Sequence, residues 1–176
     1  MDRKSMISMK GRPLTLTGRD IRVGDNAPDF TVLDGNLSEV HLKDFEGKIK
    51  VISVTPSLDT PVCDLQLRRF NNEAASLPFD VQVLNISMDL PFAISRFCTG
   101  ADIANVRALS DHRDASFGNS YGVLIKELRL LARSIFIVDK DNRVQYREIV
   151  PEQSSHPDYD KALNTLHHLL TPAKVA

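Results

Sequence analysis

The stretch Val51–Phe70, VISVTPSLDTPVCDLQLRRF, changes from strand to helix character within a few residues. Its start, VISV, is a β-branched apolar run that is typical of a buried strand. Prolines then interrupt the pattern, and Thr60 and Pro61 suit the cap and the first residue of a helix. Helical spacing along one face follows, at Cys63, Leu67, Phe70 and Ala74. The stretch therefore predicts a strand, a tight loop and a helix that carries Cys63 in its first turn.

The predicted position of Cys63 favours chemistry at sulfur. The first N–H groups of a helix have no partner within it, and the helix dipole places partial positive charge there. Both effects stabilise a thiolate relative to a thiol, and the thiolate is the reactive nucleophile. A second interpretation is that Cys63 is a small buried hydrophobe, as many free cysteines are. Position alone leaves the two interpretations open.

Further strands and helices extend this unit. Ile49–Val54 and Val81–Ile86 read as buried strands on either side of the helix, so they form a βαβ unit and should be parallel. Ser134–Val138 is a third buried strand, and residues 143–150 form its antiparallel partner after a DKDN turn. A helix over residues 157–170 closes the chain. The predicted fold class is α/β, with a central mixed β-sheet flanked by helices.

The remaining segments are harder to interpret. Residues 1–10 are expected to be a flexible N-terminus, and residues 11–176 are expected to form one domain. Residues 13–23, PLTLTGRDIRV, alternate apolar and polar side chains around Gly18, which predicts an extra N-terminal β-hairpin. Residues 101–131 show no clear period and are expected to be loop with a short helix.

Composition bounds the class of protein. The 176 residues are 42% hydrophobic and 26% charged, an ordinary globular balance with enough chain for a substantial core. A net charge of −1 gives no basis for a nucleic acid or an anionic membrane as partner. No apolar run approaches the roughly 20 residues that span a bilayer, and MDRKSMISMKG lacks the apolar core of a signal peptide. A cytoplasmic location is therefore expected.

The two cysteines, Cys63 and Cys98, do not form a C-x-x-C motif. Two cysteines cannot build a disulfide framework for a chain of this length. In a reducing cytosol, a disulfide between them would be transient rather than structural. The five histidines show no spacing with the cysteines that would make a zinc site, so no metal is expected.

Pro56, Thr60 and Cys63 fit the pattern P-x-x-x-T-x-x-C, and this segment resembles the peroxiredoxins. More narrowly, TPSLDTPVCDLQ resembles their bacterial thiol peroxidase branch, an atypical two-cysteine group. The resemblance implies a thioredoxin-like fold and attack by the Cys63 thiolate on the terminal oxygen of a hydroperoxide. It also implies that the Thr60 hydroxyl hydrogen-bonds to the thiolate and the substrate oxygen, and that Pro56 shields the sulfur from water.

SMDLPFAISRFC, at residues 87–98, resembles the thiol peroxidase segment that carries the resolving cysteine, which here would be Cys98. Asp89 is the expected cap of a helix in this segment, and Pro91 lies in the first turn. Without the resemblance, Cys98 would be interpreted as a core cysteine.

Arg133 comes directly before the third buried strand, and the resemblance places the family's active-site arginine at this position. A guanidinium near Cys63 would stabilise the thiolate and polarise the peroxide. A lone arginine at the start of a strand is otherwise usually a solvated surface charge, so this expectation depends on the resemblance.

Taken as a whole, the resemblance implies an antioxidant, thioredoxin-dependent peroxidase that reduces hydrogen peroxide and organic hydroperoxides. Cys63 would become a sulfenic acid, Cys98 would condense with it to an intramolecular disulfide, and thioredoxin would reduce that disulfide. No metal, haem or flavin cofactor is required, and the family implies a homodimer. The competing hypothesis is a non-enzymatic redox sensor that the Cys63–Cys98 disulfide switches. A sensor has no need of the P-x-x-x-T-x-x-C pattern and an arginine, so the enzyme is the favoured interpretation.

Overall fold

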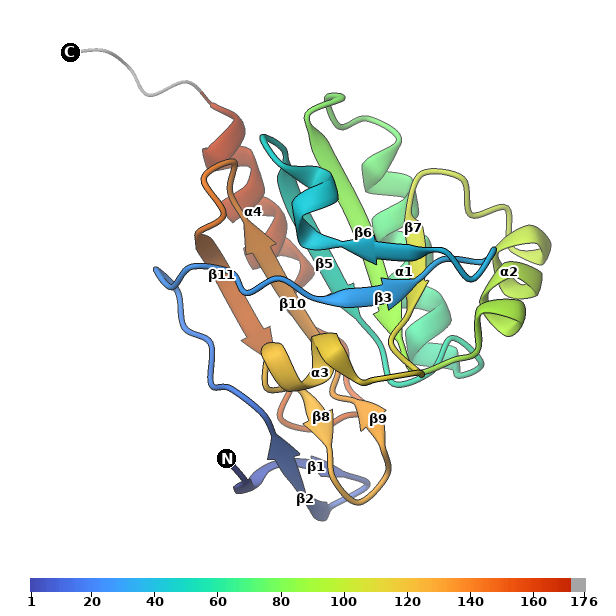
Figure 1. The fold of residues 1–176 in the computed structure, drawn as a ribbon, viewed down its shortest axis with the longest axis vertical. Helices are drawn as coiled ribbons and strands as arrows, with labels where there is room; N and C mark the ends of the chain where they lie inside the picture. The colour runs from blue at the N-terminus through green and yellow to red at the C-terminus, as the bar shows by residue number, and fades with distance from the viewer. Residues whose placement is uncertain (172–176) are drawn as a thin grey trace.

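The computed structural model describes residues 1–171, and these residues form two β-sheets, four α-helices and one short 3-10 helix, η1 (Figure 1). Seven strands make the larger sheet in the order β11-β10-β5-β6-β7-β3-β4, and four make the smaller one in the order β1-β2-β8-β9. In chain order the elements are β1 (Arg3–Met9), β2 (Arg12–Thr17), β3 (Thr31–Leu33), β4 (Glu39–His41), η1 (Leu42–Phe45), β5 (Ile49–Val54), α1 (Pro61–Ala74), β6 (Val81–Ser87), α2 (Pro91–Gly100), β7 (Arg107–Ser110), α3 (Ser116–Ser120), β8 (Leu124–Ile125), β9 (Leu130–Leu131), β10 (Ser134–Val138), β11 (Val144–Ile149) and α4 (Tyr159–Leu170).

The βαβ unit that the sequence predicts lies at the centre of the larger sheet. β5 pairs in parallel with β6, beginning with Ile49 opposite Val81, and α1 connects the two strands. β6 pairs in parallel with β7 on its other side. β10 runs antiparallel to β5 and pairs with β11, which is the predicted hairpin. The prediction of a mixed sheet flanked by helices is confirmed.

Side chains of β5 alternate between two hydrophobic cores. Ile52 and Val54 pack in the core that includes side chains of α3 and the small sheet. Ile49 and Val51 pack in the core that α1, α2 and α4 cover from the other face (Figure 1). Successive side chains of a strand point to opposite faces, so one strand can serve both cores. This burial fixes the end of β5, where the loop to α1 begins.

The N-terminal hairpin is present, but it lies earlier in the chain than predicted. β1 and β2 pair around a turn at Lys10 and Gly11, both of which have positive φ. Residues 3–9, within the segment expected to be flexible, form the strand β1. The prediction of a hairpin centred on Gly18 is wrong, because Gly18 follows β2. Only Ile7 of β1 is buried, so no apolar alternation marks that strand in the sequence. That residues 11–176 form one domain stays a prediction.

Residues 101–131 contain more regular structure than predicted. β7 joins the larger sheet beside β6, α3 is the expected short helix, and β8 and β9 extend the small sheet beside β2. These three strands have two to four residues each, which is too few to show a period in the sequence. The cap of α2 also differs from the prediction. Leu90 rather than Asp89 lies at the N-cap position, and the Asp89 side chain bonds to the loop before α1.

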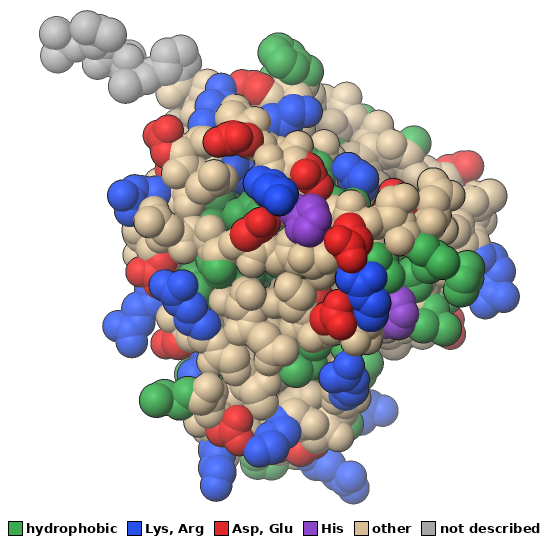
Figure 2. Space-filling model, in the orientation of Figure 1, with side chains coloured by type: hydrophobic (Ala, Val, Ile, Leu, Met, Phe, Trp, Pro, Cys, Tyr) green, Lys and Arg blue, Asp and Glu red, His purple; other side chains and the backbone are tan. Residues whose placement is uncertain are grey.

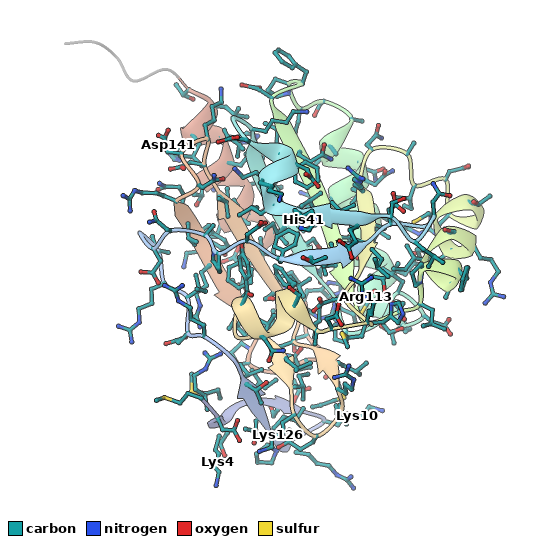
Figure 3. All side chains as sticks on the ribbon, in the orientation of Figure 1. Lys4, Lys10, His41, Arg113, Lys126 and Asp141 are labelled. Carbon is teal, nitrogen blue, oxygen red and sulfur yellow. The ribbon has the colours of Figure 1, made fainter. Side chains whose placement is uncertain are left out.

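Charged side chains of both signs mix on one face of the molecule. Figure 2 shows Asp, Glu, Lys and Arg around the histidine over β3 and β4 that Figure 3 labels as His41. Lys4, Lys10 and Lys126 lie at the end of the molecule that the small sheet forms (Figure 3). Within residues 1–171, each helix falls short of the length and apolar character that crossing a membrane requires.

Candidate active site

Cys63 lies in the first turn of α1, as the sequence predicts. The chain leaves β5 at Val54, passes through a loop over residues 55–60 and enters α1 at Pro61. Thr60 occupies the N-cap position, and the Cys63 side chain is fully buried. The unpaired N–H groups and the dipole of the helix therefore act on a sulfur atom that water does not screen.

Arg133 brings a guanidinium directly to this sulfur. Its Nη2 donates to Cys63 Sγ at 3.2 Å. Its Nη1 donates to Gln66 Oε1 at 2.9 Å, and its Nε donates to the Gln153 carbonyl oxygen at 3.0 Å. The side chain is 2% exposed, so Arg133 is not a solvated surface charge. Hydrogen bonds from its three nitrogen atoms hold the guanidinium in one orientation against the sulfur.

The charge of Arg133 has no acidic partner in the part of the chain that the structure describes. None of the salt bridges formed by residues 1–171 includes this side chain. A buried charge without a partner is costly, and a thiolate at Cys63 would supply the missing negative charge. The guanidinium can therefore stabilise negative charge at the sulfur and negative charge that develops beside it.

Gln66 and Gln153 complete the site, and sequence reasoning missed both. Gln66 is fully buried and donates from Nε2 to Ser53 Oγ at 2.8 Å, which directs its oxygen towards Arg133. Gln153 accepts the Arg133 backbone N–H through Oε1 and donates from Nε2 to the Val150 carbonyl oxygen. Gln66 follows Cys63 by three residues, so helical spacing could have placed it on the same face. Gln153 lies in a loop after β11, where no local pattern marks it.

Thr60 and Pro56 line a cavity beside Cys63. The cavity has a volume of about 330 Å³, and Arg133 and Gln153 also reach its wall. The hairpin turn contributes Met9 and Lys10, and the first turn of α1 contributes Pro61 and Val62. Thr60 makes no capping hydrogen bond, since its Oγ1 donates to the Ser57 carbonyl oxygen at 2.9 Å. A small molecule in this cavity would meet an apolar wall with the guanidinium at its edge.

Cys98 lies apart from this cavity. It is near the end of α2, half-buried against the core on the helical face, and both cysteines are free thiols. Burial raises the pKa of the Cys98 thiol. Cys98 lines a different cavity of about 260 Å³, together with Gly35 and Arg107. The structure thus groups four of the predicted site residues, Pro56, Thr60, Cys63 and Arg133, and leaves Cys98 separate from them.

The family model described as Redoxin matches residues 22–163, from the loop before β3 into α4. The chain belongs to the redoxin family. It is 54% identical over 164 residues to a thiol peroxidase of Bacillus subtilis, covering 93% of this chain and 98% of that protein. It is 56% identical over 157 residues to a thiol peroxidase of Staphylococcus aureus, covering 89% of this chain and 94% of the relative. Within the redoxins, the chain therefore groups with the thiol peroxidases, as its motifs predict.

Solved structures agree with this placement of the redoxin. A peroxiredoxin-like protein from Aquifex aeolicus superposes with a TM-score of 0.87 at 40% identity, over 95% of this chain and 99% of that one. A thiol peroxidase from Chromobacterium violaceum superposes with a TM-score of 0.81 at 25% identity, over 92% and 95% of the two chains. These similarities confirm the thioredoxin-like fold and place the chain among the peroxidases, a class of oxidoreductases.

Proposed function

We propose that this chain reduces hydroperoxides at Cys63. The Cys63 thiolate attacks the terminal oxygen of ROOH, the O–O bond breaks, and the departing RO⁻ takes up a proton. The products are ROH, which is water when the substrate is hydrogen peroxide, and Cys63 sulfenic acid. The observation that carries this proposal is the 3.2 Å contact between the Arg133 guanidinium and Cys63 Sγ at the start of α1.

Arg133, Thr60 and Pro56 prepare this step. The guanidinium offsets the charge of the thiolate before the reaction and the charge of the leaving oxygen during it. The Thr60 hydroxyl can turn towards the thiolate and the substrate, and its oxygen keeps lone pairs that can accept from the peroxide. Pro56 is buried in the wall of the cavity and keeps water from the sulfur.

Cys98 resolves the sulfenic acid in the proposed cycle. Its thiol condenses with Cys63 sulfenic acid, so that one S–S bond forms and one water molecule leaves. A disulfide needs Cα atoms within about 7 Å. Cys63 is fully buried at the start of α1, whereas Cys98 lines a cavity beside α2 that Cys63 does not reach, so α2 or the loop before α1 must open locally before the bond can form. A dithiol reductant, which we propose to be thioredoxin, then restores both thiols by exchange.

The proposed setting is the cytoplasm, where a reducing thiol pool maintains such a cycle. All steps occur at the two cysteines, so the proposed cycle uses no metal, haem or flavin cofactor.

A homodimer is also proposed from the family. Exposed apolar side chains at the beginnings of α1 and α2, Leu65 and Phe92, offer surface for such contacts. Sedimentation of the purified chain is expected to give the mass of a dimer. The mass of a monomer at all protein concentrations would contradict the proposed homodimer.

The second candidate function is a non-enzymatic redox sensor, which the separate positions of the two cysteines would also permit. A coupled assay with thioredoxin, thioredoxin reductase and NADPH separates the two functions. We expect NADPH oxidation with hydrogen peroxide and with an alkyl hydroperoxide, and none with Cys63→Ser, because a serine hydroxyl stays protonated at neutral pH. Oxidation of the cysteines without turnover would favour the sensor. Turnover by Cys63→Ser would contradict the assignment of the nucleophile.

A further inference from the structure

The Asp89 carboxylate joins the two segments that carry the cysteines. Oδ1 accepts from Ser57 Oγ at 2.7 Å, and Oδ2 accepts from the Leu58 N–H at 2.8 Å. Oδ2 also accepts from Ser87 Oγ, at the end of β6, at 2.8 Å. Ser57 and Leu58 belong to the loop before α1, whereas Asp89 stands directly before the helix that carries Cys98. One side chain therefore ties the Cys63 loop to the start of α2.

This connection reaches Thr60 through one further residue. Ser57 donates its hydroxyl to Asp89, and the Ser57 carbonyl oxygen accepts from Thr60 Oγ1 at 2.9 Å. The Asp59 N–H is also directed to Ser57 Oγ, at 3.3 Å. Ser57 is thus the point at which the loop is fixed, and its own position depends on Asp89.

The backbone of Asp89 is held as well. Ser110 Oγ, at the end of β7, donates to the Asp89 carbonyl oxygen at 2.5 Å. Between the loop and α2 lies a hollow of about 280 Å³, lined by Leu58, Asp89, Ile94 and Phe97 among others. Hydrogen bonds to a carboxylate are stronger than bonds between neutral groups, so Asp89 is the principal polar attachment across this hollow.

We propose that Asp89 is a positioning residue that latches the Cys63 loop in its peroxide-reactive arrangement, and that release of this latch sets how fast Cys98 resolves the sulfenic acid. The proposal rests on the proposed function, since it concerns the fate of the Cys63 sulfenic acid. Either movement through which the disulfide can form, of the loop or of α2, acts on the hydrogen bonds of one carboxylate. Asp89 thereby couples the two segments without touching the reacting atoms.

The latch decides between two fates of the sulfenic acid. While the loop is latched, a second ROOH can transfer an oxygen atom to the sulfur, which yields Cys63 sulfinic acid and ROH. Once the loop opens, Cys98 attacks instead, and the products are the disulfide and water. A stronger latch therefore speeds the first peroxide reaction but raises the share of sulfinic acid, and a weaker latch does the opposite.

The test compares Asp89→Ala, which removes both acceptor oxygens, with Asp89→Asn. The amide oxygen of Asn can still accept from Leu58 N–H while its NH₂ donates to Ser57 Oγ, so Asn should restore much of the latch. Asp160→Ala, whose side chain is 88% exposed on α4, is the matched control for loss of a carboxylate. Each protein is treated with rising hydrogen peroxide, and intact mass spectrometry measures the ratio of sulfinic acid to disulfide. Rapid quenching gives the rate of the first oxidation, and thermal melting shows whether the variant is folded.

With Asp89→Ala we expect the sulfinic-to-disulfide ratio and the rate of the first oxidation each to fall about tenfold, the effect of one charge-assisted hydrogen bond. The ratio and the rate of Asp89→Asn should lie near those of wild type, and the ratio and the rate of Asp160→Ala should equal the wild-type values.

A folded Asp89→Ala with an unchanged sulfinic-to-disulfide ratio, whatever its melting temperature, would overturn the proposal. If Asp89→Ala does not fold, Ser57→Ala decides, because it removes the Oγ bond to Asp89, together with the long Asp59 N–H contact to the same oxygen, and keeps the Leu58 bond. A lower sulfinic-to-disulfide ratio supports the latch, and an unchanged ratio overturns it. A wild-type chain that consumes no peroxide would instead overturn the proposed function.

Discussion

Replacing Arg133 by methionine separates the role of its charge from its role in packing. Methionine has a similar length and an apolar, flexible side chain, but it has neither the charge nor the donors of the guanidinium. The substitution removes the 3.2 Å contact to Cys63 Sγ and leaves Gln66 Oε1 and the Gln153 carbonyl oxygen without this donor. All three of these acceptors belong to the buried site.

The contact to sulfur sets the expected loss of rate. A hydrogen bond to a charged group contributes about 1.5–3 kcal/mol, so peroxide reduction should slow by about tenfold to a hundredfold. The two effects on stability oppose each other. Each acceptor left unpaired lowers the free energy of unfolding by about 1–3 kcal/mol. Removing a buried charge that has no acidic partner raises the free energy of unfolding by a similar amount. Activity should therefore fall while the free energy of unfolding stays within about 2 kcal/mol of wild type.

Stopped-flow or rapid-quench measurement of the first oxidation gives the rate, and urea unfolding gives the stability. Arg69→Met is the control, because this arginine is half-exposed on α1 and, within residues 1–171, pairs with the surface carboxylates of Glu73 and Asp160. It should leave the rate of oxidation unchanged. A rate for Arg133→Met within about threefold of wild type would refute the reasoning, because the charge-assisted bond would then contribute less than the range for such bonds.

Two further variants test other parts of the site and the fold. Thr60→Val keeps the shape of the side chain but removes the hydroxyl, so the first oxidation by peroxide should slow about tenfold with little change in melting temperature; an unchanged rate would exclude Thr60 from the reaction. Asp111→Asn tests a pH effect. Burial raises the pKa of Asp111 to about 6 from an ordinary value of 3.8, so its contribution to stability is full below that ordinary value and is lost as pH rises through about 6. Urea unfolding should show the stability of the variant, relative to wild type, increasing between about pH 4 and pH 7, and a constant difference would contradict this.

Apolar runs made the centre of the fold predictable. Ile49–Val54, Val81–Ile86 and Ser134–Val138 stand out because strands buried on both faces need apolar side chains almost throughout. β1 did not stand out, since backbone pairing with β2 holds a strand whose side chains are mostly exposed. The short strand β7 was also hard to predict, because four residues are too few to show a strand period.

The candidate site was predictable only where its signals are local. Cys63 could be placed from the cap and spacing of one helix, and the family pattern added Pro56, Thr60 and Arg133. The contributions of Gln153 and Asp89 come from hydrogen bonds to residues 20 and 32 positions away in the chain. Such contacts depend on how strands and loops meet in three dimensions, and no local pattern of the sequence contains that information.

Mapping of the oxidised cysteines tests the central claim most directly. Wild-type chain treated with an equimolar amount of hydrogen peroxide, blocked at free thiols and digested without reduction, should yield one peptide pair joined through Cys63 and Cys98. Cys98→Ser treated in the same way should consume the first equivalent at the wild-type rate and carry sulfenic acid at Cys63. Both cysteines of the wild type remaining as free thiols, or oxidation confined to Cys98, would contradict the account.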